Sequence, residues 1–257
     1  MDIDTKRHKA IVREETARRV KAYAERLRPG ESVSPMIDLA MPKRTDRVLD
    51  VACGAGRVAI AFAPLVNSVV GIDLTQEMVD LAYHRAREQG ITNAAFILGD
   101  AERLKFAPRL FDLVTCRSTF HLLVRPEKAL HEMSRVLRRD GRLVIYDLVA
   151  SDDPKKAERH NAIMKLRDPS HVGIQSAEKW HAFIRECGLH VAAKIVTMMK
   201  REFGDWMDMV GADPERRQRV LAAMLETVRD DTAGLGPRAS GEKVTFSQTA
   251  AVWLVTK

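Results

Sequence analysis

Short apolar runs alternate with amphipathic stretches between residues 34 and 150. The apolar runs predict buried strands over residues 48–51, 68–73, 95–98, 111–116 and 142–148. Between them, apolar residues recur at the spacing of one helix face, which predicts helices over residues 55–63, 76–89 and 126–138. Strands that recur with helices between them indicate an α/β fold, in which a parallel sheet is covered on both faces.

The segments on either side of this alternation have a different pattern. A charged stretch with a narrow apolar stripe predicts an amphipathic helix over residues 9–28, which Pro29 and Gly30 end. After Ala150 the predicted elements are helices over residues 154–166, 177–187 and 214–231, and extended segments over 191–198 and 243–256. We therefore expect a single domain over residues 1–257, with a core at 34–150 and, at 151–240, a cover that shields a site at the sheet edge from water.

Composition and charge narrow the classes of function. The chain has 257 residues, a net charge of +7 and 5% aromatic residues. Because Lys and Arg are interleaved with Asp and Glu, the pattern disfavours a nucleic-acid partner. No apolar stretch approaches the roughly 20 residues of a membrane span, and the N-terminus lacks the apolar region of a secretion signal. Three cysteines without CxxC spacing fit a reducing compartment. We expect a cytoplasmic protein, either a monomer or a homodimer.

The stretch VLDVACGAGRVA, residues 48–59, is typical of a strand that enters a turn and then a helix. Gly54 and Gly56 leave bare backbone where a Cβ would block a ligand, and the helix start offers unpaired N–H groups. Asp73 ends the next strand, where a carboxylate accepts hydrogen bonds from ribose hydroxyls. Asp100 supplies a second acceptor for an exocyclic amine. These features predict a nucleoside cofactor, and Ala59 at the place of a third glycine disfavours NAD.

Four motifs in order resemble one family. VLDVACGAG, GIDLTQEMVDLA, LGDAERLKF and the long FDLVTCRSTFHLLVRPEKALHEMSRVLRRDGRLVIYD are similar to the class I S-adenosylmethionine-dependent methyltransferases. The likeness is strongest to their ubiquinone/menaquinone-biosynthesis-type small-molecule branch, also called methyltransferase type 11. It implies a Rossmann-like, doubly wound sheet of seven strands in the order 3-2-1-4-5-7-6, with strand 7 antiparallel. It further implies an N-terminal helix, a helical cover after strand 5, S-adenosyl-L-methionine as methyl donor and S-adenosyl-L-homocysteine as product.

The resemblance also assigns cofactor contacts by position within the core at 34–150. Residues of the first motif would line the methionine and ribose end, Asp73 would bind the ribose hydroxyls, and Asp100 would bind the adenine amino group. The remaining positions would pack on adenine, offer a backbone N–H to it, or pass close to the methionine part. The full set is Asp50, Ala52, Gly54, Gly56, Asp73, Leu74, Met78, Asp100, Ala101, Arg117 and Ser118.

Methyl transfer needs an acceptor that has lost a proton, so a base is expected near it. His121 resembles the first histidine of a paired-histidine segment of the family, and Leu122 departs from the pattern at the second. His171 lies in the predicted cover. Both are candidate catalytic residues, and Phe120 and Arg167 beside them are candidate substrate contacts. The histidines lack the spacing of a metal site with a third carboxylate, so no metal is predicted.

These residues predict an enzyme that moves a methyl group by in-line transfer to oxygen or carbon of a small organic acceptor. A methyltransferase of RNA or tRNA is an alternative prompted by the positive charge, although CRSTFH stands where an NPPY-like loop would be expected. Cys53 and Cys116 invite comparison with arsenic methyltransferases, but small buried cysteines usually only pack. Binding of the cofactor without methylation, as in a cyclase, a decarboxylase or a regulatory protein, also stays open. The N-terminal helix could close over the site or pair with a second chain.

Overall fold

A mixed sheet runs through the protein in a computed structural model that describes residues 4–25, 33–241 and 243–257. Its strand order is β3-β2-β1-β4-β5-β8-β6, and the short β7 pairs with β8. The strands are β1 (Arg47–Val51), β2 (Ser68–Asp73), β3 (Ala94–Leu98), β4 (Phe111–Arg117), β5 (Leu137–Val149), β6 (His190–Glu202), β7 (Arg238–Ser240) and β8 (Lys243–Thr256). The first five are parallel, whereas β8 is antiparallel to both β5 and β6. The predicted α/β fold and strand order are confirmed, with β8 as the antiparallel seventh strand of the order and β7 as an addition.

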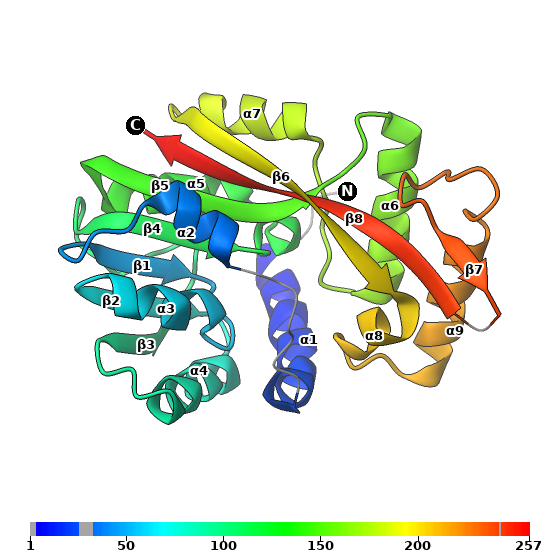
Figure 1. Cartoon of the computed structure of the whole chain (residues 1–257), viewed down its shortest axis with the longest axis horizontal. Helices are drawn as coiled ribbons and strands as arrows, with labels where there is room; N and C mark the ends of the chain where they lie inside the picture. Colours follow the sequence, from blue (N-terminus) through cyan, green and yellow to red (C-terminus); the bar gives the residue numbers. More distant parts are fainter. Residues whose placement is uncertain (1–3, 26–32, 242) are drawn as a thin grey trace.

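Helices cover both faces of this sheet (Figure 1). They are α1 (Thr5–Glu25), α2 (Ser34–Ala40), α3 (Arg57–Phe62), η1 (Ala63–Leu65), α4 (Gln76–Glu88), η2 (Phe120–Leu122), α5 (Pro126–Val136), α6 (Pro154–Arg167), α7 (Ala177–Glu186), α8 (Phe203–Asp208) and α9 (Pro214–Leu225). One buried apolar cluster joins α2 and α3 to the sheet and continues under α6, α8 and α9, while a second joins α5 and α7. Two apolar layers on one sheet are the arrangement that buries strands on both faces.

The predicted elements differ from the observed ones at a few places. The helix predicted over residues 214–231 ends at Leu225, because the chain then turns: the Val228 N–H donates to the Leu225 carbonyl at 3.1 Å. β5 begins at Leu137 instead of residue 142, since Leu137 pairs with Phe111 across an irregularity in the register. Helices α2 and α8 and strand β7 are too short to produce a periodic pattern, and the sequence did not predict them. The predicted break at Pro29 and Gly30 lies outside the described residues.

The carboxyl ends of the parallel strands meet at one edge of the sheet, and α1 lies across that edge. Figure 1 shows α1 between the half of the molecule that holds β1 to β4 and the half that holds α6, α8 and α9. In a doubly wound sheet this edge is where ligands bind. None of the helices in the described parts of the chain is long and apolar enough to span a membrane.

Candidate active site

The turn after β1 has an unusual backbone. Ala52, Gly54 and Gly56 all adopt positive φ, at 56°, 51° and 78°. At Gly56 a Cβ would also lie 3.0 Å from the Cβ of Ala82 in α4, so both the conformation and the close approach require glycine there. At Gly54 a Cβ would meet nothing within 4 Å, which leaves the backbone open toward the sheet edge. The turn therefore presents main chain instead of side chains to a ligand.

Asp73 at the end of β2 is held by this turn. Its Oδ2 accepts the Gly54 N–H at 2.8 Å and its Oδ1 accepts the Thr75 N–H at 3.0 Å. Burial raises the pKa of Asp73, and these backbone hydrogen bonds oppose the rise. Each carboxylate oxygen has a second lone pair. The side chain is thus a fixed acceptor at the strand end, as ribose recognition requires.

Asp50 forms the floor of the site at the end of β1 and is only 1% exposed. The Thr115 hydroxyl donates to its Oδ1 at 2.8 Å, and the Ala59 N–H donates to its Oδ2 at 3.1 Å. Burial raises the pKa of Asp50 to about 7, against these hydrogen bonds and the charge of Arg117, which lower it. The carboxyl group therefore changes its charge near neutral pH.

Asp100, which follows β3, is engaged by α1. Its Oδ2 accepts from Lys9 Nζ at 2.6 Å, and the same ammonium donates to Glu102 at 2.8 Å. Glu102 is 2% exposed and also accepts from Arg125 at 2.8 Å. Lys9 was not predicted as a site residue, because its partner lies 91 positions away.

These residues line one cleft at the sheet edge. Every predicted cofactor residue except Gly56 contributes to its wall. One face of α1 closes the cleft, through Thr5, His8, Lys9, Val12, Thr16 and Arg19. The sequence left open whether the N-terminal helix closes over the site or pairs with a second chain. In the structure, α1 lies over the site. The bare backbone after β1 and the fixed carboxylates at the ends of β2 and β3 are groups that fit an adenosyl cofactor.

A histidine–aspartate pair lies beside this cleft. His121 in η2 donates through Nδ1 to Asp147 Oδ1 at 2.7 Å. Asp147, at the end of β5, is 1% exposed and accepts three backbone N–H groups as well, from Thr119, Phe120 and Leu148 at 2.7 to 3.0 Å. Burial raises the pKa of Asp147, but the facing His121 and these hydrogen bonds outweigh it, so the pKa lies below its usual value. The carboxylate is ionised and engages Nδ1 of His121, so Nε2 is the ring nitrogen that this pair leaves for other contacts.

His171 from the predicted cover packs against this pair, with its ring centroid 5.7 Å from that of His121. It is 1% exposed, and its Nε2 lies 2.8 Å from Asn161 Oδ1. The Asn161 amide donates to two backbone carbonyls, so its Oδ1 must accept and His171 Nε2 carries the proton. Burial lowers the pKa of His171 to about 3, and the nearby His121 acts in the same direction. His171 therefore stays neutral near pH 7.

Phe120 and Arg167, the predicted substrate contacts, lie in different places. Phe120 packs edge-on against Trp180 of α7 at 5.1 Å and lines a second cavity beside the cleft. Arg167 donates to the Trp206 carbonyl at 2.8 Å and stacks 4.3 Å from the centre of that ring. It lines neither the cleft nor the second cavity. The sequence could not show this contact, because α8, which carries Trp206, was not predicted.

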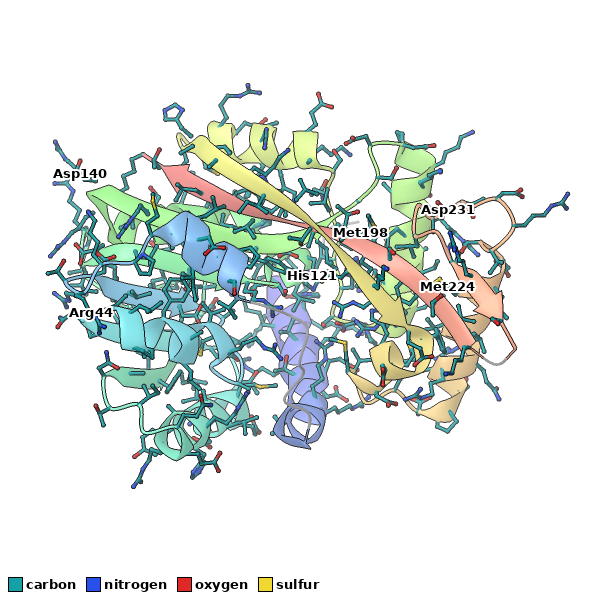
Figure 2. The ribbon with its side chains drawn as sticks, viewed as in Figure 1. Arg44, His121, Asp140, Met198, Met224 and Asp231 are labelled. Atoms are coloured by element: carbon teal, nitrogen blue, oxygen red, sulfur yellow. The ribbon has the colours of Figure 1, made fainter. Side chains whose placement is uncertain are left out.

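In the His121–Asp147 pair, Asp147 is the residue to which the sequence analysis gave no role. Its place at the carboxyl end of a predicted strand was the one signal that could have marked it as a site residue. Its pairing with His121 depends on the adjacency of β4 and β5. Figure 2 shows His121 at the centre of the molecule beside α1, where His8 Nε2 lies 2.9 Å from the carbonyl of Leu122.

A family model described as "Methyltransferase domain" matches residues 42–207 of the chain. The uncharacterized methyltransferase YcgJ of Bacillus subtilis is 33% identical over 228 residues, which cover 88% of each chain. Its crystal structure superimposes with a TM-score of 0.81 and covers 88% of this chain and 97% of that one, at 30% identity.

Two further relatives are similar. A putative methyltransferase of Bacillus halodurans has a TM-score of 0.83 and 27% identity, over 88% of this chain and 98% of that one. The ubiquinone/menaquinone biosynthesis C-methyltransferase UbiE of Azotobacter vinelandii is 34% identical over 115 residues, or 43% of this chain and 46% of the relative. The similarity to UbiE is therefore confined to a part of each protein.

The fold, the cleft and the relatives agree. The strand order with an antiparallel seventh strand is the one that the motifs implied, and the cleft has the groups that an adenosyl cofactor requires. The family match spans the turn after β1, the carboxylates after β2 and β3, and the His121–Asp147 pair. The chain therefore belongs to the class I S-adenosylmethionine-dependent methyltransferases and uses S-adenosylmethionine as its cofactor.

Proposed function

We propose that this enzyme methylates oxygen or carbon of a small organic acceptor, with His121 as the base that removes the acceptor's proton. The observation that supports this most is the His121–Asp147 pair beside the cofactor cleft. When bound, the cofactor supplies an electrophilic methyl group on its sulfonium. His121 Nε2 would take the proton from the acceptor hydroxyl or activated carbon, and the Asp147 carboxylate would stabilise the imidazolium that forms. The lone pair freed on the acceptor can then attack the methyl carbon in line.

The second cavity is a suitable place for the acceptor. It shares Leu123 and Val124 with the cofactor cleft, and both His121 and Asp147 contribute to its wall. Most of its other lining is apolar or aromatic: Phe120, Pro126, Leu148, Val172, Ile174, Trp180 and Phe183. Apolar cavities with few polar groups are typical sites for small molecules.

The segment after α6 supports the role proposed for residues 151–240 as a cover. The Val172 N–H donates to the His121 carbonyl at 2.8 Å, and Ala150 forms a bridge with Ser176. Neutral, buried His171 sits behind the His121 ring, where we propose that it helps to keep water from the proposed base. This role does not require His171 to exchange a proton itself.

The test is methyl transfer from radiolabelled S-adenosylmethionine to small molecules of a cell extract. We expect labelled product from the wild type, a loss of about 100-fold or more in His121→Ala, and unchanged binding of S-adenosylhomocysteine. His131→Ala, at an exposed position of α5, is the matched control and should retain activity.

Three outcomes would contradict the proposal. Label that enters RNA would favour the nucleic-acid alternative, and no labelled product with intact cofactor binding would favour chemistry other than methylation. Activity of His121→Ala within threefold of the wild type would remove His121 as the base while leaving the family assignment intact.

A further inference from the structure

Helix α1 follows the cofactor cleft along its length. Lys9 near its start pairs with Asp100, and Arg13 Nε donates to the Leu74 carbonyl at 3.4 Å. Thr16 and Arg19, one and two turns further on, also line the cleft. Because an α-helix rises about 1.5 Å per residue, Arg19 lies roughly 15 Å along the axis from Lys9. Arg19 is thus at the end of the cleft away from the proposed adenine acceptor.

Arg19 has an unmatched donor in this position. Its side chain is only 12% exposed, and a terminal nitrogen forms an ion pair with Asp168, which follows α6. Its buried Nε–H finds no hydrogen-bond acceptor in the described parts of the chain. A buried donor without an acceptor costs free energy, so such a group in a ligand cleft points to an acceptor on the ligand.

The other end of the cofactor from adenine carries an amino-acid group with an α-carboxylate. A guanidinium binds a carboxylate through two parallel N–H donors, and Arg has donors enough to serve Asp168 at the same time. We propose that Arg19 binds the α-carboxylate of the methionine part of the cofactor, with Asp168 as a positioning residue that holds the guanidinium at the cleft.

Two other cations of the cleft already have acceptors. Lys9 Nζ is shared between Asp100 and Glu102. Arg85 donates to the Ala55 carbonyl at 3.1 Å, so that this guanidinium supports the turn after β1. Neither Lys9 nor Arg85 is left with a buried, unmatched Nε–H as Arg19 is. A third cation of the cleft, Arg117, stacks 4.9 Å from the centre of the Tyr146 ring. The inference concerns the cofactor and does not depend on the identity of the acceptor.

The experiment is a cycle in which the enzyme and the ligand are changed separately. Isothermal titration calorimetry would measure the affinity for S-adenosylhomocysteine and for its decarboxylated analogue, S-adenosyl-3-thiopropylamine, which keeps the amine. In Arg19→Ala and Arg19→Gln we expect the affinity for S-adenosylhomocysteine to fall at least tenfold and that for the analogue to change less than threefold. Arg18→Ala, the neighbouring position with a side chain 47% exposed, should leave both affinities unchanged.

Asp168→Asn tests the positioning role. It should weaken binding of S-adenosylhomocysteine by threefold to tenfold and leave the analogue unaffected. An equal loss for both ligands in Arg19→Gln would overturn the proposal, because Arg19 would then act only through the placement of α1. No loss for either ligand would also overturn it. If Arg19→Ala fails to fold, the Arg19→Gln cycle and the wild type's preference for S-adenosylhomocysteine over the analogue, expected to be tenfold or more, decide the matter.

Discussion

Replacing Asp50 with Asn should make the ligand-free protein more stable at neutral and alkaline pH. Burial raises the pKa of Asp50 from 3.8 to about 7, whereas the unfolded chain keeps the ordinary value. The native protein therefore holds a proton that the unfolded chain has already released between about pH 4 and pH 7. Its stability falls as the pH rises through this window and is level above it. A change of pKa from 3.8 to about 7 corresponds to about 4 kcal/mol.

Asparagine removes the charge and can keep the local hydrogen bonds. Its carbonyl can accept the Ala59 N–H, and its amide can donate to Thr115, whose hydroxyl has the Leu49 carbonyl as another acceptor at 3.5 Å. The difference in unfolding free energy between Asp50→Asn and the wild type should therefore grow with pH instead of staying constant.

Urea unfolding of both proteins without cofactor, at pH values from 4 to 8, measures this difference. We expect it to rise by about 4 kcal/mol in favour of the variant and to level off above pH 7. Asp38→Asn, at an exposed position of α2, is the control and should follow the wild type. A difference that does not vary with pH would refute the reasoning that burial dominates the charge state of Asp50.

Three further variants test the geometry of the site. Asp73→Ala removes the fixed acceptor after β2, so calorimetry should show S-adenosylhomocysteine binding at least about 100-fold weaker; a loss below tenfold would contradict the ribose assignment. Asp147→Asn places an amide N–H among backbone donors and should cost about 3 kcal/mol in urea unfolding at pH 7. Because the native pKa of Asp147 is lowered, the difference in unfolding free energy between the wild type and Asp147→Asn should narrow as the pH falls below about 4. A difference that stays constant in acid would argue against the lowered pKa. Gly56→Ala should lower the unfolding free energy by about 1–3 kcal/mol through its positive φ and the contact with Ala82, whereas an unchanged thermal midpoint would show that the turn relaxes.

The cofactor half of the site could be predicted because its signals are local. A buried strand in a parallel sheet is a short apolar run, and the residue that ends it lies at the ligand edge. Asp73 ends β2, Asp50 is the last residue but one of β1, and Gly54 lies in the turn that must leave room for a ligand. The pairing of β1 with β2 brings the Gly54 N–H to Asp73, so local pattern and fold class were sufficient.

Contacts between segments far apart in the sequence could not be predicted in this way. The apolar stripe of α1 predicts a helix and says nothing about its partners, so the pairing of Lys9 with Asp100 had no signal. Arg167 is the last residue of α6, a helix that the sequence predicted, but its side chain contacts Trp206 on a helix of six residues that has no usable periodicity. In each case packing between elements decides where a charged side chain ends up.

Helix α1 contacts both the strand ends of the core and helix α9, and it does so through ion pairs instead of a wide apolar face. Toward the core, Lys9 pairs with Asp100 and Glu102; toward the cover, Glu15 pairs with Arg216 of α9 at 3.0 Å. Most of these partners are largely buried, and removing one member of a buried pair leaves an uncompensated charge that is costly. The wall of the cofactor cleft that α1 provides therefore depends on residues 151–240, the proposed cover, although none of these residues lines that cleft. This is why contiguous motifs could indicate residues at the strand ends, while the position of α1 over the cleft follows only from the folded chain.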